Sequence, residues 1–313
     1  EDHKEHILNS LRAYNIEPEI QYTTPEDPGT GLAQQAAQAG ADVVIAAGGD
    51  GTLHAIACGL IGTRTTLGII PMGTMNNIAH SLEIPEDIDE ACKIIATGTT
   101  GMIDVGMMNE HVFLEVAGVG LEAELFPAAE DIKKTEAFST VRGIFHGLKT
   151  LLAFQPTQFV VSFDGRRTRR FRALQISVCN SPYYGAHLQF APYAVMDDGF
   201  LDVLIYKNFS KLEYILHAIS ISQGKRVLEA RVTHRKVKTL RIRSVTPAEI
   251  HVDGVPIGQT PATISIQPGA LRVRIAQHVA SGPKMSSEEQ KQTRLYQKAQ
   301  HYTAENEKGT LHV

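Results

Sequence analysis

Several features that would assign this 313-residue chain to a familiar class are scarce or missing. It has only three cysteines, each in an apolar segment, which is typical of reduced thiols in a cytoplasmic protein rather than of disulfides. No Cys/His spacing resembles a metal site, no signal peptide is visible, and no apolar run reaches the roughly 18 residues that a membrane span needs. The formal net charge of −4 gives no reason to expect a nucleic acid as partner.

The strongest local pattern that is present begins with a short apolar run at residues 41–47. Such a run, bounded by glycines, is typical of a buried parallel strand. Gly-Gly-Asp-Gly follows at 48–51, and residues 52–60 are apolar on one face, which predicts a helix. A strand, a glycine turn and a helix N-terminus together form an anion site from backbone N–H groups. We expect Asp50 on an exposed turn there, where it would hold a metal, orient a donor or accept a proton.

A second unit of the same kind comes next along the chain. Residues 67–71 predict another buried strand, and Met-Gly-Thr-Met-Asn-Asn at 72–77 leads into a helical start. Two such units place two polar loops at the carboxyl edge of one sheet, where open α/β sheets bind their ligands. The sequence therefore predicts an α/β domain with a ligand site at that edge, and the resemblance described next implies that the ligand is a nucleotide.

Together these two motifs resemble the catalytic domain of the diacylglycerol kinase family, which are lipid kinases related to NAD kinase. The matching residues are GGDGT at 48–52 and the pattern P-x-G-T-x-N-x-x-A at 71–79, and the resemblance continues to about residue 277. It implies that ATP and Mg²⁺ are the cofactors and that Asp50 is catalytic. The nucleotide-binding residues that it implies are Thr23, Thr24, Gly48, Gly49, Asp50, Gly51, Thr52, Gly73, Thr74 and Asn76.

Residues 1–14 predict a helix. The resemblance also implies a strand and an Asn-Pro-containing loop before this helix. Neither is in the sequence, so we expect part of the nucleotide site to be unaccounted for. A short strand is predicted at 19–22. The first domain is expected to end near residue 103.

From there the hydrophobic pattern changes to the alternation of β-strands, which predicts an antiparallel β-sandwich at 104–277. Hairpin turns are expected at Asn109-Glu110 and at Asp164-Gly165. Residues 278–313 form a polar tail, helical or disordered, that could pack on the first domain. The chain is thus expected to be an α/β domain followed by a β-rich lipid-binding domain, with the site in the cleft between them.

The second domain carries three further groups of candidate site residues. The resemblance gives Asp104 a catalytic role, although a turn aspartate explains it equally well. Glu122 and Glu124 follow a Gly-x-Gly pattern that we do not interpret as a dinucleotide motif, because a hairpin precedes it. These two carboxylates would bind the hydroxyl groups of a substrate headgroup, or they are solvated surface acids.

An acidic loop at residues 191–202 supplies the third group. Three carboxylates within six residues suit a hard cation such as Mg²⁺. The resemblance implies a structural metal site formed by the carboxylate of Asp198 and the backbone carbonyls of Val195 and Phe200. An acidic loop without metal is the alternative.

One departure from the family pattern bears directly on activity. The pattern D-G-E implies a glutamate that acts as general base for the acceptor hydroxyl, and this chain has Asp253-Gly254-Val255. Valine cannot accept a proton, and losing a positioned base typically costs about 10²–10⁴ in rate.

Two functions therefore compete. The chain is an ATP-dependent lipid kinase that acts on a diacylglycerol-like lipid, or it is a nucleotide- or lipid-binding regulator that has lost turnover. NAD kinase is a third and weaker interpretation. The lipid kinase would be cytoplasmic and peripheral at the inner membrane face, with a lipid as its partner, and a homodimer is among the oligomeric states left open.

Overall fold

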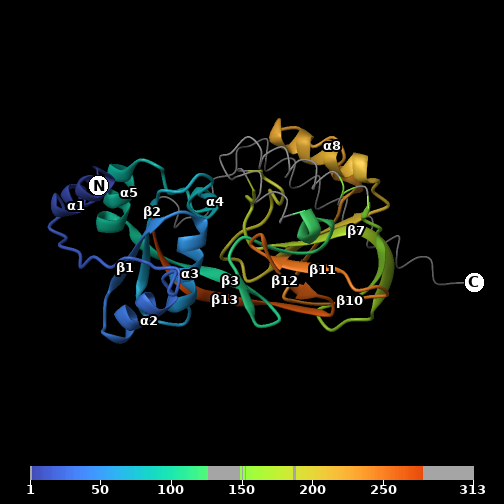
Figure 1. Ribbon diagram of the computed structural model, residues 1–313, viewed down its shortest axis with the longest axis horizontal. Helices are drawn as coiled ribbons and strands as arrows, with labels where there is room; N and C mark the ends of the chain where they lie inside the picture. Colours follow the sequence, from blue (N-terminus) through green and yellow to red (C-terminus); the bar gives the residue numbers. More distant parts are fainter. Residues whose placement is uncertain (1, 126–148, 150, 152, 186–187, 278–313) are drawn as a thin grey trace, which may run out of the picture. The chain divides into compact units, whose positions relative to one another are not determined.

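The computed structural model describes residues 2–125, 149, 151, 153–185 and 188–277, so the predicted tail at 278–313 lies outside the described residues. These residues form an N-terminal α/β domain and a C-terminal β-sandwich-like domain (Figure 1). The described helices are α1 (Asp2–Arg12), α2 (Thr30–Gln38), α3 (Asp50–Leu60), α4 (Asn77–Ser81), α5 (Ile88–Thr97), α8 (Lys211–Ser222) and the 3₁₀ helix η1 (Glu229–Arg231). The described strands are β1 (Val43–Gly48), β2 (Thr66–Pro71), β3 (Thr99–Met108), β4 (His111–Phe113), β5 (Val116–Gly120), β6 (Thr157–Phe163), β7 (Arg169–Cys179), β8 (Leu201–Lys207), β9 (Thr233–Val237), β10 (Thr239–Ser244), β11 (Glu249–Val252), β12 (Val255–Gln259) and β13 (Ala262–Ile275).

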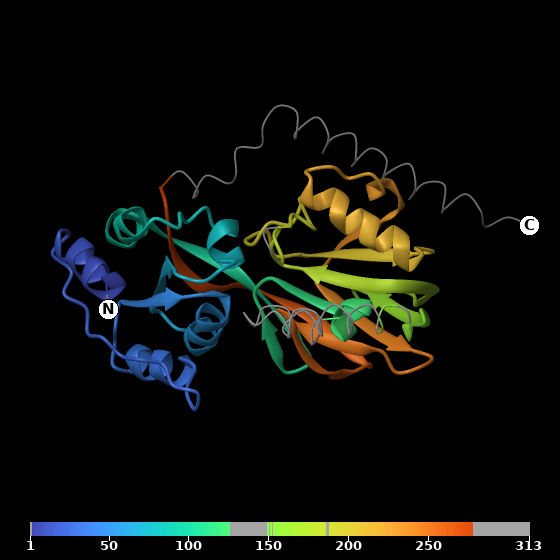
Figure 2. The same cartoon turned by 45° about the horizontal axis from the view of Figure 1, so that its top comes forward.

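The N-terminal domain is built on the two predicted parallel strands. β1 and β2 pair in register from Val43 with Thr66 to Gly48 with Pro71, so the two following loops leave the sheet at one edge. α5 lies on one side of these strands and α2 on the other (Figures 1 and 2). β2 is buried throughout, but β1 is only half-buried because it is the last strand at that side of the described sheet. The prediction of a fully buried first strand is therefore wrong.

The last described strand, β13, connects the two domains. It pairs in parallel with β2 at Val273 and Leu67 and antiparallel along nearly all of β3. β3 itself runs across the expected domain boundary near residue 103, and that boundary stays a prediction. β13 runs without a break from Ala262 to Ile275, with a register shift between Gln267 and Leu271.

The C-terminal domain confirms both predicted hairpins. Asn109 joins β3 to β4 with φ 54°, and Asp164 and Gly165 join β6 to β7 with φ 48° and 68°. At Asp164-Gly165 both central residues have positive φ, which is the signature of the type I′ turn, whose twist matches that of the strands. These hairpins bring alternating apolar side chains to one core, which includes Phe113, Phe159, Val203, Ile242 and Ile264.

A second core lies between α8 and the strands next to it (Figure 1). Tyr206 of β8 is fully buried there, and its ring meets the ring of Tyr214 edge to face at 4.9 Å. Ser210 and Glu213 form a capping box at the start of α8, which explains why the helix begins there.

The secondary structure differs from the sequence-based prediction at three places: one predicted strand is absent and two strands were not predicted. Residues 19–22 are exposed and belong to no ladder, so the short strand predicted there does not form. β9 and β12 were missed because their side chains are mostly polar or exposed and show no apolar alternation.

Among the described residues, no helix combines the length and apolar character needed to cross a bilayer.

Cross-strand packing in β3 gives a test of the core. Gly106 pairs with Phe113 of β4, and a Cβ at Gly106 would lie 2.1 Å from the phenyl ring. We expect Gly106→Ala to lower the free energy of unfolding by about 1–3 kcal/mol, because overpacking displaces the ring. In urea titrations the double variant Gly106→Ala/Phe113→Leu should lose less than the two single losses combined. Additive losses would contradict this packing.

Candidate functional site

The two glycine loops touch through their backbones. A Cβ at Gly73 would lie 2.5 Å from Cα of Gly49, and one at Gly49 would lie 3.1 Å from Cα of Gly73. The N–H of Met72 donates to the carbonyl of Gly48 at 3.0 Å, which continues the β1–β2 pairing into the loops. Only glycine permits this approach at both positions, so the two motifs recognised separately in the sequence form one surface.

The N-terminus of α3 is open at this surface. Gly49 is its N-cap, and no side chain caps it among the described residues. Gly51 is exposed, and a Cβ there would meet nothing within 4 Å. Amide groups at an uncapped helix N-terminus attract anions, because the N–H groups are unsatisfied and the helix dipole is positive there.

Asp50 bridges the two loops and is not on an exposed turn, so that expectation is wrong. It is the first residue of α3 and is half-buried. Its carboxylate accepts the N–H groups of Asn77 and Ile78, both at 3.2 Å, at the start of α4. The side chain therefore holds α4 against α3.

The remaining predicted nucleotide residues of these loops differ in exposure. Asn76 is buried, with φ 48°, and its amide closes the loop by accepting the N–H of Gly73 at 2.9 Å and donating to the carbonyl of Gly73. Thr74 is exposed, and Thr52 is half-buried against Gly48. Asn76 thus shapes the loop from inside, and nucleotide binding by these residues stays a prediction.

Thr23 and Thr24 lie before α2 in an exposed turn. The hydroxyl of Thr24 accepts the N–H of Asp27 at 3.2 Å, and the Thr23 methyl group lies beside Gly29. Sequence reasoning overlooked Asp27, whose carboxylate accepts the N–H groups of Gly29, Gly31 and Leu32. These hydrogen bonds, the largest being that from Gly29, lower the pKa of Asp27.

Asp253, from the motif that ends in Val255, is a structural centre of the site. Its carboxylate accepts three consecutive backbone N–H groups, from Leu114, Glu115 and Val116, at 2.8–3.0 Å. It also lies 2.9 Å from Nδ1 of His54 on α3. One carboxylate therefore connects the first glycine loop's helix to the start of β5.

His54 is strongly affected by this contact. Burial favours the neutral ring, but the hydrogen bonds and charges of Asp253 and Cys58 outweigh it and raise the pKa of His54 to about 10. His54 is thus a cation at neutral pH, next to the glycine loops. The sequence shows His54 only as an unusual residue after GGDGT.

Asp104 is nearly fully buried, at 2% exposure, and ties three segments together. Its carboxylate accepts the N–H groups of Gly199 and Gly269 at 2.6 and 2.7 Å, and its own N–H donates to the carbonyl of Met196. Burial raises the pKa of Asp104 despite these bonds. This geometry is that of a brace, and the catalytic role stays a prediction.

The acidic loop meets a cation of the protein itself. The carboxylate of Asp198 accepts the N–H of Phe200 at 3.0 Å and lies 2.5 Å from Nζ of Lys236 on β9. Lys236 and His234 also contact Asp202. Among the described residues no group of three His, Cys, Asp or Glu side chains could hold a metal.

The predicted Mg²⁺ donors are one carboxylate, that of Asp198, and the backbone carbonyls of Val195 and Phe200, so metal binding by this loop stays a prediction. The Lys236 ammonium already pairs with the Asp198 carboxylate, and we derive no step through a metal there. Lys236 lies on the polar strand β9, which the sequence pattern did not reveal, so the competing charge could not be foreseen.

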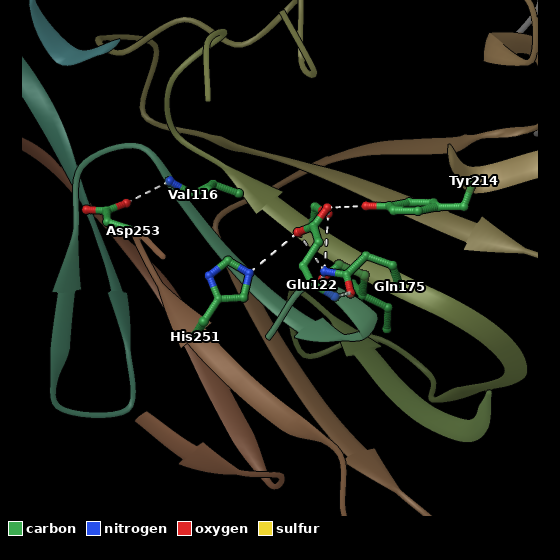
Figure 3. A network of polar contacts seen from close by, with 8 residues as sticks. Val116, Glu122, Gln175, Tyr214, His251 and Asp253 are labelled. Carbon is green, nitrogen blue, oxygen red and sulfur yellow. Dashed lines mark hydrogen bonds and ion pairs between the residues drawn. The ribbon is translucent and has the colours of Figure 1, made fainter. Parts of the chain in front are cut away.

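Glu122 lies at the centre of a buried polar network (Figure 3). Gln175 donates to its carboxylate at 2.9 Å, Ser177 donates at 3.2 Å, and the hydroxyl of Tyr214 on α8 also donates. Nε2 of His251 is 3.5 Å away. The protein's own donors surround this carboxylate, so its geometry links α8 to the sheet, and headgroup binding by Glu122 stays a prediction.

Glu124, the other predicted substrate residue, does not join this network in the described hydrogen bonds. It is half-buried, and burial followed by the charge of Glu249 raises its pKa. The Gly-x-Gly pattern before these acids has a packing explanation. A Cβ at Gly118 would lie 2.1 Å from Nε2 of His251, and Gly120 has φ 116°.

Two further residues, Val255 and Glu115, bear on which group could act as the general base. Val255 begins β12 and is 61% exposed. Its hydrocarbon side chain cannot accept a proton. Glu115, which sequence reasoning overlooked, is buried at 4% exposure beside the residues just described. It lies in an apolar stretch of the sequence, which gave no signal of its surroundings.

Comparison with known proteins agrees with this geometry. The family model described as diacylglycerol kinase catalytic domain matches residues 1–108, and that described as YegS C-terminal NAD kinase beta sandwich-like domain matches residues 115–275. The chain therefore belongs to the bacterial-type diacylglycerol kinase family of NAD kinase-like lipid kinases. The sequence-based assignment of family and fold class is confirmed.

Individual relatives support the same assignment. The diacylglycerol kinase of Bacillus subtilis (strain 168) is 28% identical over 263 residues, covering 83% of this chain and 86% of that protein. A diacylglycerol kinase of Staphylococcus aureus (strain Newman) is 29% identical over 74% of this chain and 73% of that protein. A solved structure of a candidate diacylglycerol kinase from Bacillus anthracis str. Sterne has a TM-score of 0.71 at 26% identity, covering 88% of this chain and 91% of that one.

The contact between His54 and Asp253 predicts a pH-dependent stability. The folded-state pKa of His54, about 10, exceeds its ordinary value of 6.5, so the contribution is complete below pH 6.5 and disappears as the pH rises through 10. Urea unfolding at pH 6, 8 and 10 should show wild type losing its advantage over His54→Ala across this window. A constant difference between the two proteins would contradict a protonated His54.

Proposed function

We propose that this protein is an ATP-dependent lipid kinase that transfers the γ-phosphate of ATP to the hydroxyl of a diacylglycerol-like lipid. The observation that carries the proposal is the backbone contact of Gly49 with Gly73, bridged by Asp50. It joins two Gly-Thr loops into one surface next to the uncapped N-terminus of α3. Family membership supports phosphate transfer to a lipid as the reaction.

The phosphates of ATP would bind at the N-terminus of α3, where the exposed Gly51 leaves room for them. Backbone N–H groups stabilise such anions without a side chain. Mg²⁺ that accompanies ATP neutralises charge on the phosphates. The cationic His54, one turn along α3, adds positive charge to this region, which favours the developing charge of the transferred phosphoryl group.

Asp50 would position α4 rather than bind the phosphates itself. Its carboxylate fixes the start of α4, which begins at Asn77 directly after the second glycine loop. Phosphoryl transfer depends mainly on positioning and on charge stabilisation, so a small displacement of α4 would slow the reaction.

A catalytically impaired regulator is the second candidate, and the exposed Val255 favours it. Such a protein would bind ATP through the same loops without transferring phosphate. NAD kinase remains the weakest interpretation.

A lipid substrate requires contact with a membrane surface, and we propose that α8 makes it at the inner membrane face. Leu212, Leu216 and Ile219 are 65%, 51% and 47% exposed, at spacings that place them on one helix face. Burying such a stripe in the acyl boundary is how interfacial helices bind membranes. The exposed Lys225 just after α8 would meet anionic headgroups.

The function is tested by incubating the protein with labelled ATP and vesicles that contain diacylglycerol, a sphingoid lipid or phosphatidylglycerol, with NAD in a parallel reaction. We expect a labelled lipid, and we expect Asp50→Asn to lower the rate by about 10²-fold because α4 keeps only one of its two hydrogen bonds to residue 50 and shifts. Asp50→Asn should cost about 1 kcal/mol of stability, since the amide oxygen keeps one acceptor.

The matched control is Asp87→Asn, the same change at the N-cap of α5, where Asp87 accepts the N–H of Glu90 at 3.0 Å. It should leave the transfer rate unchanged. ATP binding by calorimetry without transfer to any lipid would favour the regulator, and a labelled NAD would favour the third interpretation.

Membrane contact through α8 is tested by sedimentation with vesicles that contain phosphatidylglycerol. Leu216→Asp should release most of the bound protein, because it places a charge in the apolar stripe. Val245→Asp is the control, since Val245 is 68% exposed in the turn after β10 and outside α8. Equal binding of the two variants would exclude α8 as the contact.

A further inference from the structure

The backbone of Glu115 contacts two other segments of the chain, the Asp253 turn and the residues just after β7. Its N–H donates to Oδ1 of Asp253 at 3.0 Å, and its carbonyl accepts the N–H groups of Asn180 and Ser181 at 2.9 and 3.1 Å. The backbone is therefore fixed from two sides, between β4 and β5. This fixed backbone gives the Glu115 side chain a defined position.

The carboxylate of Glu115 points into the polar region between the glycine loops and the Asp253 turn. The side chain of Asn77, at the start of α4, hydrogen-bonds to it, and the charges of Asp50, Asp253 and His54 act on it. Asn77 is the residue whose N–H binds Asp50. Glu115 and Asp50 thus meet the same end of α4 from opposite domains.

One oxygen of this carboxylate has no protein partner. Oε2 is buried, and no hydrogen-bond partner reaches it in the described part of the chain. An unsatisfied buried carboxylate oxygen costs free energy, and a purely structural brace would have both oxygens satisfied, as Asp104 and Asp253 have.

We propose that Glu115 is the catalytic residue that accepts the proton of the lipid hydroxyl, because its partnerless oxygen lies at the junction of the glycine loops and the Asp253 turn. The assignment rests on the proposed kinase function. It explains how turnover continues with Val255 where a base is expected.

In the reaction the O–H bond of the substrate hydroxyl breaks and its proton passes to Oε2 of Glu115. The hydroxyl oxygen forms a bond to the γ-phosphorus of ATP, the bond from that phosphorus to the β-phosphate bridging oxygen breaks, and ADP leaves. Glu115 returns the proton to water when the product departs. The hydroxyl must displace the packing over Oε2 as it binds, in keeping with catalytic hydrogen bonds that tighten only in the substrate complex.

The surroundings of Glu115 favour uptake of a proton by its carboxylate. Burial and then the charges of Asp253 and Asp50 raise the pKa of Glu115 well above its ordinary value, while Asn77 and the cationic His54 oppose the rise. Glu115 in turn raises the pKa of the buried Tyr184, after the larger effects of burial and Glu122. A base is most effective when its pKa lies near the working pH.

The test compares wild type with Glu115→Gln, which keeps the size of the side chain and removes the base. With the lipid that wild type phosphorylates, kcat should fall by about 10²–10⁴ while KM for ATP stays the same. The rise of wild-type kcat with pH should disappear in Glu115→Gln. Glu249→Gln, a half-buried carboxylate of β11 bonded to Gln259, should keep wild-type kcat and pH profile.

Stability provides an independent readout. Because the folded-state pKa of Glu115 is raised above its ordinary value of 4.5, wild type loses stability as the pH rises from there, so the stability of Glu115→Gln relative to wild type should increase with pH. A brace would instead lose stability. If Glu115→Gln fails to fold, Glu115→Asp must show a lowered kcat with a shifted pH profile.

The outcomes separate the two proposals. An active wild type with an equally active Glu115→Gln overturns the assignment of Glu115 and leaves the kinase function in place. A wild type that binds ATP but phosphorylates no lipid overturns both. An unchanged pH profile in Glu115→Asp also overturns the assignment.

Discussion

The carboxylate of Asp253 is the interaction on which the rest of the site depends. It satisfies three successive N–H groups at the start of β5 and binds His54 of α3, so one side chain fixes the second domain's strand and the first domain's helix. Hydrogen bonds from several backbone N–H groups hold such a carboxylate in one position. Without it, Glu115 and His54 would have no defined place beside the glycine loops.

Several other carboxylates in this protein also connect segments that are distant in the sequence. Asp50 holds α4, Asp104 joins β3 to two loops, and Glu122 ties α8 to the sheet. Each is buried or half-buried, and each finds N–H, O–H or amide donors from segments distant in sequence. Glu115 differs because, within the described part of the chain, its Oε2 has no such donor. That difference separates a group available for chemistry from groups that hold the fold.

Charge inside the site is balanced by the protein itself. His54 is protonated because Asp253 is next to it, and Lys236 is paired with Asp198 in the loop where a metal was expected. Buried charges require such partners, since leaving one unpaired costs several kcal/mol. The same rule makes the surface of the glycine loops suited to phosphate, because the helix N-terminus there still has open N–H groups.

The sequence by itself determined the family, the fold class, the two glycine loops and both hairpins, because these depend on local patterns. Glycine turns, apolar runs and Asp-Gly or Asn-Glu turns are encoded within a few residues of one another. Only the tertiary structure decided which carboxylates became braces and which stayed free. Asp50, Asp104 and Glu115 look alike in the sequence, and their donors come from segments up to 165 positions away. The free energy of a buried charge depends on those donors, which no local pattern records.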